Sequence, residues 1–235
     1  MTVIYWGPTT SSLVQTSRRR SGANRRGPGV IIETLPVGAL QTNCYLIGCE
    51  ETRLAAVIDP GGDADEILAA LKRHQLTLRS ILLTHAHFDH IGGVAALVEA
   101  TRASVALHPG DRPILRAKGG AALFGAFIRS VPEPDLALAD GQVLEIGRLR
   151  VRVLHTPGHT PGHVTFYEPA SRSAFDGDVL FMQGIGRTDF PGSSYAQLMD
   201  SIRTKLFTLP DDTAIYPGHG PATTVGDEKQ FNPFL

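Results

Sequence analysis

Short apolar runs punctuated by glycine, proline and aspartate follow one another along the chain from Val30 onward. Residues 30–37, 43–50 and 54–61 are three such runs, and the third leads into the turn "DPGG". Runs of this length, rich in valine, isoleucine or tyrosine and bounded by turn residues, are typical of β-strands. The pattern therefore predicts three consecutive strands.

The spacing of the apolar residues changes after this turn. Asp63 and Glu66 stand at the spacing of a capping box, in which two side chains satisfy the free amides of the first helical turn. Apolar positions then recur at helical intervals, at Ile67, Leu68 and Leu71. We expect a helix from Asp63 to about Gln75.

A continuous apolar run and a second helical pattern come next. Residues 79–85, "RSILLTH", predict a strand that is buried on both faces. Residues 91–103 predict a helix with three apolar side chains directed inward, Val94, Leu97 and Val98. The first half of the chain thus has the order β-β-β-α-β-α.

The second half returns to strand-like runs. They occupy residues 104–111, 142–159, 163–169, 173–181 and 213–220, with a hairpin turn at Gly147. A helix over residues 193–209 is indicated by Leu198, Ile202 and Leu206, whereas residues 119–135 show no clear period. Strands with helices interspersed in both halves predict an α/β fold in which two sheets pack face to face with helices outside, giving four layers, αββα.

The two cysteines give no sign of a disulfide. Cys44 and Cys49 fall in one predicted strand, and a separation of five places them on opposite faces. Such a pair cannot bind one metal ion or pair with each other, so we interpret both as small buried side chains. Nothing in the cysteine usage indicates an oxidising compartment.

Length and hydropathy indicate one soluble domain. The chain has 235 residues, 42% of them hydrophobic, which suffices for a sizeable core. No apolar stretch approaches the roughly 20 residues that span a bilayer. We expect a single domain over residues 30–235, located in the cytoplasm, with no membrane partner.

Charge is unevenly distributed along the chain. Residues 1–29 contain no acidic residue and five arginines, Arg18, Arg19, Arg20, Arg25 and Arg26. We expect this basic segment to be a disordered leader, although its composition also fits an organelle transit peptide. Without it the formal net charge changes from −1 to −6, which argues against nucleic acid as a partner.

The segment "LLTHAHFDHIGG", residues 82–93, concentrates potential metal ligands. His85, His87, Asp89 and His90 lie within six positions directly after the apolar run. In extended backbone the first three would point the same way, because side chains alternate with period two. A lone histidine after a strand usually has a structural role, but four such side chains would each need a partner when buried. Imidazoles and a carboxylate together favour Zn²⁺ or another first-row divalent ion.

"THAHFDH" resembles the H-x-H-x-D-H motif of the metallo-β-lactamase superfamily, and three later motifs of that family follow in order. "HTPGHTPGH" resembles the block that gives His159 as a ligand, "FDGDVLF" the block that gives Asp178, and "YPGHG" the block that gives His219. The resemblance extends over nearly all of residues 30–235. It implies the same αββα sandwich that the apolar pattern predicts.

The resemblance also implies a centre of two divalent cations, with zinc expected first and iron or manganese also compatible with these ligands. One ion would be held by His85, His87 and His159. The other would be held by Asp89, His90 and His219. Asp178 would bridge the two ions, and Asp89 and Asp178 are the predicted catalytic carboxylates. Such a pair of ions lowers the pKa of a shared water towards about 7 and so favours hydrolysis.

Within the superfamily the chain is most similar to short bacterial glyoxalase II-like hydrolases, which cleave the thioester of S-acylglutathione. "GIGRTDFPG" and the terminal "PGHGPATTVGDEKQFNPFL" support this likeness. Asp178 speaks against zinc β-lactamases, whose best-known members resemble cysteine at that position. Longer glyoxalase II enzymes add a helical domain that helps to hold glutathione, whereas 16 residues follow His219 here. Contacts to glutathione therefore cannot be carried over.

Other activities share these motifs. Persulfide dioxygenases resemble the chain through "GRTDF" and "FTLPDDTAIYP" and use one iron held by two histidines and an aspartate, but "YPGHGP" favours a hydrolase. Lactonases of the same superfamily would differ in the walls of the site. A non-catalytic metal-binding protein would be expected to have lost some ligands, yet all seven are present.

Four further side chains near these motifs have two interpretations each. His155 and His163 either orient ligands from behind or are hydrogen-bonded structural residues, and the second role is favoured. Asp176 would share the face of Asp178, but the Gly-Asp pair of the family motif favours Asp178 as the ligand. Arg187 either contacts an anion or pairs with an aspartate such as Asp189, and the ion pair is favoured.

Overall fold

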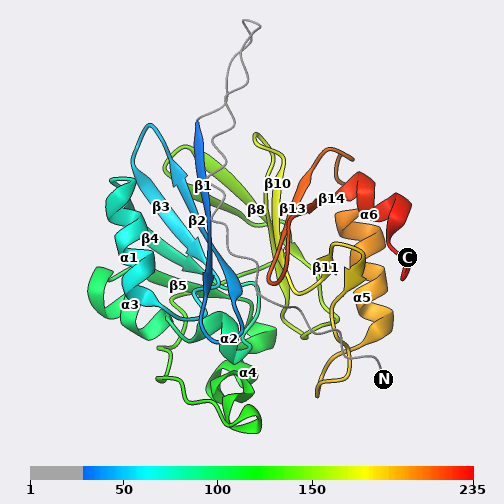
Figure 1. The fold of residues 1–235 in the computed structure, drawn as a ribbon, viewed down its shortest axis with the longest axis horizontal. Coiled ribbons are helices and arrows are strands. Elements are labelled where there is room, and N and C mark those ends of the chain that lie inside the picture. The colour runs from blue at the N-terminus through cyan, green and yellow to red at the C-terminus, as the bar shows by residue number, and fades with distance from the viewer. Residues whose placement is uncertain (1–28) are drawn as a thin grey trace, which may run out of the picture.

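The structure, a computed structural model, describes residues 29–235. The disordered leader predicted over residues 1–29 therefore lies outside the described residues, except for Gly29. Two six-stranded sheets stand side by side with helices on their outer faces (Figure 1). No helix in the described part has both the length and the apolar character needed to cross a membrane.

The first sheet follows the order of the chain. Its strands are β1 (Val30–Val37), β2 (Thr42–Cys49), β3 (Leu54–Ile58), β4 (Thr77–Leu82), β5 (Ser104–Leu107) and β6 (Leu136–Ala137). Neighbours are antiparallel from β1 to β3 and parallel from β3 to β6. The three parallel steps require crossovers. The first is made by α1 (Ala64–Arg73), the second by α2 (Phe88–Ile91) and α3 (Val94–Thr101), and the third by the short helical segments over residues 109–124.

The second sheet has the order β14-β13-β10-β9-β8-β7 and is antiparallel except where β10 meets β13. Its strands are β7 (Val143–Ile146), β8 (Leu149–His155), β9 (Val164–Glu168), β10 (Ser173–Gly177), β13 (Ala214–Pro217) and β14 (Thr223–Thr224). A small hairpin of β11 (Leu180–Phe181) and β12 (Gly184–Ile185) follows β10.

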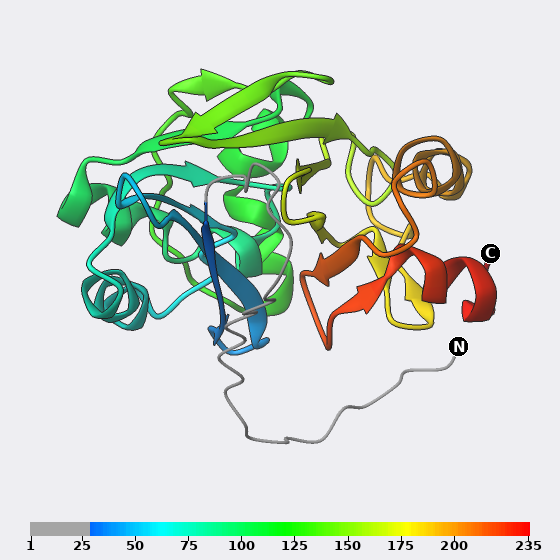
Figure 2. The same ribbon diagram turned by 90° about the horizontal axis from the view of Figure 1, so that it is seen from above.

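The remaining helices lie at the ends and outer faces of the sheets. They are η1 (Pro109–Asp111), α4 (Arg112–Arg116), η2 (Lys118–Phe124), α5 (Tyr195–Ser201), η3 (Ile202–Leu206) and α6 (Val225–Phe231). In the view from above, α1 and α5 lie on opposite outer sides of the two sheets (Figure 2).

Three separate apolar cores hold the layers together. Ile67 and Leu97 of the outer helices pack on Val57 of the first sheet. Between the sheets, Ile58 and Phe166 belong to a second core, and a third core joins the second sheet to α5 and η3. Each sheet thus contributes to one core between the sheets and to one beneath its outer helices, which produces four layers. The predicted αββα sandwich is confirmed.

The cysteine prediction is confirmed, because Cys44 lies in the first core and Cys49 in the core between the sheets. Both are free thiols. The capping-box prediction is wrong in detail. Asp63 precedes α1 in a left-handed conformation and makes no cap hydrogen bond, since its Oδ2 accepts from the amide of Gly38 in the β1–β2 turn at 2.8 Å.

Candidate metal centre

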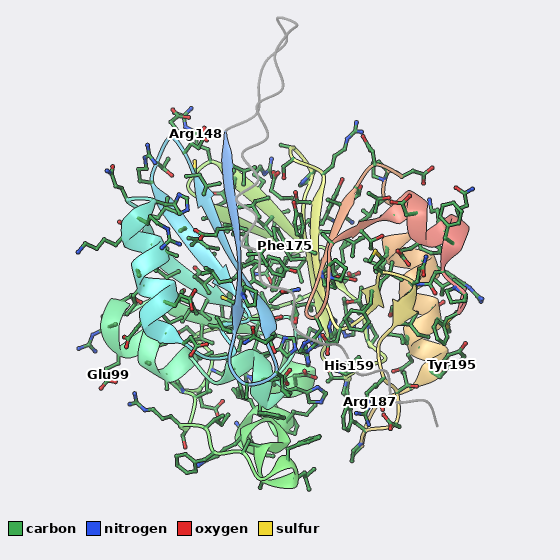
Figure 3. The ribbon with its side chains drawn as sticks, viewed as in Figure 1. Glu99, Arg148, His159, Phe175, Arg187 and Tyr195 are labelled. Carbon is green, nitrogen blue, oxygen red and sulfur yellow. The ribbon has the colours of Figure 1, made fainter. Side chains whose placement is uncertain are left out.

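The predicted ligands lie on loops that leave the strands of both sheets. His85 and His87 follow β4, His159 follows β8, and Asp178 follows β10. His219 follows β13. The loop that bears it is tied to the first sheet, because the backbone N–H of Asn43 donates to the carbonyl oxygen of Gly218 at 2.7 Å. In Figure 3, His159 lies at this end of the strands, close to Arg187. The structure thus brings all seven predicted residues to one place.

His85, His87 and His159 form the first donor group. One ring nitrogen from each lies within 4.8 Å of the others, and His159 Nε2 is 2.9 Å from His87 Nδ1. The strand predicted over residues 79–85 was too long, since β4 ends at Leu82 and His85 and His87 both stand on the irregular backbone that follows. They nevertheless face a common point.

The outer nitrogens of this group are fixed by hydrogen bonds. His159 Nδ1 donates to the carbonyl oxygen of Arg187 at 2.8 Å, and His85 Nδ1 lies 3.0 Å from the hydroxyl of Thr84. That hydroxyl donates to Asp59 and so can accept from His85. Both rings therefore present an unprotonated Nε2 to the centre, and the Nε2 of His85 is buried without a hydrogen-bond partner.

Burial keeps two rings of the first donor group, His85 and His87, neutral. The pKa of His85 is well below its usual value, chiefly because the ring is buried and secondly because it faces His90. Burial, followed by the neighbouring His159, lowers the pKa of His87 to about 3. Neutral imidazole is the form that binds metal ions, so His85 and His87 can coordinate without losing a proton first.

Asp89, His90 and His219 form the second donor group, again with donor atoms within 4.8 Å of one another. His219 Nε2 lies 3.1 Å from Asp89 Oδ2, and His90 Nε2 lies 3.5 Å from the same oxygen. The hydroxyl of Thr42 donates to that oxygen at 3.0 Å. The group combines two imidazoles with one carboxylate.

This second donor group has the opposite electrostatics. Although burial opposes it, the carboxylates of Asp89 and Asp178 raise the pKa of His90 to about 10. Burial would raise the pKa of Asp89, but the nearby rings of His90 and His219 outweigh it. The pKa of Asp89 therefore lies well below its usual range. The surroundings of this group therefore stabilise positive charge.

Asp178 lies between the two donor groups. Its Oδ2 is 3.6 Å from His159 Nε2 and its Oδ1 is 3.6 Å from His90 Nε2. The Oδ1 is buried without a hydrogen-bond partner, as is His90 Nε2. A β-carbon on Gly218 would lie 2.2 Å from that oxygen, so only glycine fits there. Unpartnered buried oxygens and nitrogens that face one another fit a cationic centre of two divalent ions.

Asp59 is a functional residue that the sequence analysis treated only as part of a turn. It accepts from His90 Nδ1 at 3.0 Å and from the amide and hydroxyl of Thr84 at 2.8 and 2.5 Å. It forms a third possible donor group with His85 and His90. Because its oxygens already accept these bonds, we interpret it as the carboxylate that orients His90. The turn sequence "DPGG", which contains Asp59, gave no sign of this contact.

Asp111 is a second carboxylate that the sequence analysis missed. It is fully buried in η1, where its Oδ2 accepts from the amide of Ala86 and the hydroxyl of Thr160, at 3.0 and 2.8 Å. Its Oδ1 accepts from the amide of Gly162 at 2.6 Å. The three bonds join the loop of His85 and His87 to the loop of His159. No periodicity in "ALHPGD" marks such a role.

The side chains with two interpretations are now placed. His163 accepts at Nε2 from the backbone amide of Asp178 at 3.2 Å and stacks on His85 with ring centroids 5.1 Å apart. It therefore supports the centre from behind, which is the interpretation that the sequence analysis did not favour. Asp176 lies in none of the donor groups and accepts from the amide of Leu180. Burial raises its pKa well above the usual value.

His155 stacks on His108, with ring centroids 4.2 Å apart, and bonds to the carbonyl of Pro161. It is a structural residue, as favoured. The ion pair predicted for Arg187 is confirmed, with Nε and a terminal nitrogen 3.0 and 2.9 Å from the two oxygens of Asp189.

Comparison with known proteins agrees with this geometry. Residues 37–219 match the family model of the metallo-β-lactamase superfamily. The chain is 42% identical over 212 residues to the hydroxyacylglutathione hydrolase GloC of Haemophilus influenzae. That alignment covers 87% of this chain and 97% of GloC.

Three solved structures share the fold over most of the chain. BLEG-1, a B3 metallo-β-lactamase, is 43% identical with a TM-score of 0.83, covering 87% of this chain and 99% of BLEG-1. TTHA1623 in a di-iron-bound form is 43% identical with a TM-score of 0.80, covering 86% and 99% of the two chains. ETHE1 from Myxococcus xanthus is 36% identical with a TM-score of 0.72, covering 86% and 83%. The chain belongs to the metallo-β-lactamase superfamily.

Proposed function

We propose that the protein is a metal-dependent hydrolase of S-acylglutathione thioesters such as S-lactoylglutathione. The observation that supports it is the pair of donor groups with Asp178 between them. In this proposal the first group holds one divalent ion and the second group the other, with Asp178 shared. Zinc is the expected metal, and iron or manganese suits the same ligands.

Ions bound there would polarise the thioester carbonyl and supply a hydroxide at neutral pH. The chain positions the ligands for this task. Arg187 O and Asp59 fix the ring orientation of His159 and His90, and Asp89 and Asp178 supply the catalytic carboxylates. A thiolate is a good leaving group, so the acyl carbon is the centre that needs stabilisation.

The similarity to GloC supports glutathione as the thiol of the substrate. We propose a small-molecule thioester as the partner, with neither nucleic acid nor membrane, because the acidic body of the chain would repel a phosphate backbone. We further propose that residues 30–235 act as one domain, since ligands from both sheets are needed for each donor group.

Persulfide oxidation with O₂ is the second candidate. The "GRTDF" segment lies against the centre through the carbonyl of Arg187, and the fold similarity to ETHE1 extends over most of both chains. A single iron held by two histidines and an aspartate would suffice for this activity and would leave sites for O₂. The second donor group favours the hydrolase, because a dioxygenase with one iron would not need it. A lactonase would use the same two ions with different walls.

Metal analysis combined with an assay panel tests the proposal. The purified protein is analysed for zinc, iron and manganese, then assayed with S-lactoylglutathione, with glutathione persulfide under O₂ uptake, with an acyl-homoserine lactone and with nitrocefin. We expect two metal ions per chain and hydrolysis of the thioester as the highest kcat/KM. One iron per chain with O₂ uptake, or faster lactone or β-lactam hydrolysis, would overturn the proposal.

A pair of histidine variants controls for general damage. His87→Ala removes a ligand of the first donor group and should abolish turnover. His74→Ala removes a histidine whose Nε2 bonds to Glu33 on the outer side of the first sheet, and it should leave turnover unchanged. Equal activity of the two variants would contradict the role assigned to His87.

A further inference from the structure

Three phenyl rings stand in a row beside the first donor group. The ring of Phe190 lies with its centroid 5.1 Å from that of His87 and 6.1 Å from that of His159. Phe124 lies 6.3 Å from Phe190 and 5.3 Å from Phe88. We call Phe88, Phe124 and Phe190 the aromatic wall. Its Phe190 end stands beside two predicted ligands, His87 and His159.

The wall has a fixed base. Gly119 of η2 takes a φ of +63°, and a β-carbon there would lie 2.2 Å from the amide nitrogen of Phe88. Ala121, two residues later, is 2% exposed. The backbone of η2 therefore packs directly against α2, and this contact holds Phe124 in line with the other two rings. The wall is a built feature and not the tip of a free loop.

The Phe124 end of the wall is exposed, whereas Phe88 and Phe190 are half-buried. The guanidinium of Arg187 lies over the ring of Phe190, 4.5 Å from its centroid. Phe124 is 55% exposed, whereas the phenylalanines of the sheets, Phe166 and Phe175, are 0% and 1% exposed. Contiguous apolar surface beside a catalytic centre marks a site for an apolar ligand group. The acyl part of a lactoyl thioester has only a methyl and a hydroxyl group, so that substrate leaves the wall unused.

We propose, on the basis of the proposed thioesterase function, that the aromatic wall receives the acyl side chain, and that the preferred substrates are thioesters with an aryl or bulky apolar acyl group. The side chain of an acyl group is attached directly to the reacting carbonyl, within reach of a ring that touches His87 and His159. A phenyl group can pack edge-to-face against the wall, as the rings of Phe124 and Phe190 do with each other. The peptide part of glutathione would lose hydrogen bonds to water there.

Two thioesters of the same thiol test this assignment. S-mandeloylglutathione and S-lactoylglutathione share the thiol and the α-hydroxyl and differ by phenyl in place of methyl. In both, water adds OH to the acyl carbon, the C–S bond breaks and the thiol takes the proton. We expect kcat/KM to be at least about tenfold higher for the mandeloyl ester.

The variant Phe124→Ala shortens the wall without touching a predicted ligand. It should lower kcat/KM for the mandeloyl ester by about tenfold and leave the lactoyl ester within about twofold. Phe127→Ala is the matched control, because Phe127 is on the same segment and 87% exposed, with its ring against Lys118. The control should change neither ester. Calorimetric titration with the two product acids, mandelate and lactate, makes the same comparison without turnover. Mandelate should bind more tightly than lactate to the wild type, and the two should bind equally to Phe124→Ala.

The outcomes separate this inference from the proposed function. Equal rates for the two esters, or a Phe124→Ala effect of the same size on both, overturn the acyl assignment and leave the thioesterase standing. No hydrolysis of either ester overturns the proposed function, and the acyl assignment with it. Sedimentation analysis gives a further outcome. If the wild type is a dimer and Phe124→Ala is a monomer, the wall is a contact between two copies of the chain, and the proposal is overturned.

Discussion

The two donor groups use similar side chains in opposite electrostatic settings. The first has three imidazoles, and the outer nitrogens of two of them meet a hydroxyl and a backbone carbonyl. The second has a carboxylate of its own and a further carboxylate, Asp59, directly behind His90. Burial lowers the pKa of His87 to about 3, whereas carboxylates raise that of His90 to about 10.

This difference shows how one chain can prepare two neighbouring cation sites. A site with neutral ligands binds through its lone pairs alone, and its geometry must be held by the backbone around it. A site with carboxylates binds through charge, and the charges themselves hold the ligand rings. Asp111 joins the loops of the first group, and Asp59 orients the second. The following variants test this division, from the largest expected effect to the smallest.

Asp178→Asn should have the largest effect, because Asp178 is the one carboxylate common to both groups. Removing its charge should lower kcat by about a thousandfold, which corresponds to about 4 kcal/mol of transition-state stabilisation. Steady-state kinetics measure the change, and circular dichroism should show an unchanged fold. Full activity in this variant would mean that the two groups act independently.

Asp59→Asn should weaken the second donor group more than the first, because Asp59 contacts His90 directly and reaches His85 only through the hydroxyl of Thr84. The amide keeps the shape of the side chain but removes the charge behind His90, so metal affinity at that group should fall by about ten- to a hundredfold. Competition with a chromogenic chelator, followed by metal analysis, measures each equivalent of bound metal. If both donor groups lost metal affinity to the same extent, Asp59 would not act mainly on the second group.

Asp111→Asn should act on the first group, and mainly through stability. An amide nitrogen would face the amide of Ala86 or of Gly162, so one buried bond is lost and a donor is left unpaired. The free energy of unfolding should fall by about 1–3 kcal/mol, which lowers Tm by about 2–4 °C per kcal/mol. Thermal unfolding of the metal-free protein measures it. An unchanged Tm would show that the loops are held by other contacts.

Arg187→Ala should have the smallest effect. The guanidinium forms an exposed ion pair with Asp189, and only the backbone carbonyl of Arg187 contacts His159. Metal content and Tm should therefore match those of the wild type. Loss of metal from the first group in this variant would show that the side chain, and not the backbone alone, supports His159.

The sequence predicted the layers and the ligands for identifiable physical reasons. Short apolar runs bounded by turn residues mark the strands, and the four-layer sandwich follows from their order. Ligands could be found because His85, His87, Asp89 and His90 stand within six positions and the later motifs follow in family order. The strand assigned to residues 79–85 was too long, since apolar pattern does not show where hydrogen bonding ends.

The supporting residues could not be predicted in the same way. Asp59 reaches His90 across 31 positions, and Asp111 reaches Gly162 across 51. Such contacts depend on how the two sheets place their loops, which no local pattern records. The same holds for α6 and β14, which follow His219 and were missed because the short run "TTVGDEKQF" has too few apolar residues to show a period.

Anomalous diffraction from crystals of the metal-loaded protein tests the central claim most directly. The account predicts two metal peaks about 3.5–4 Å apart, one on His85, His87 and His159 and the other on Asp89, His90 and His219, with Asp178 touching both. A single peak on the first group, with Asp89 and His219 turned away from any metal, would contradict it.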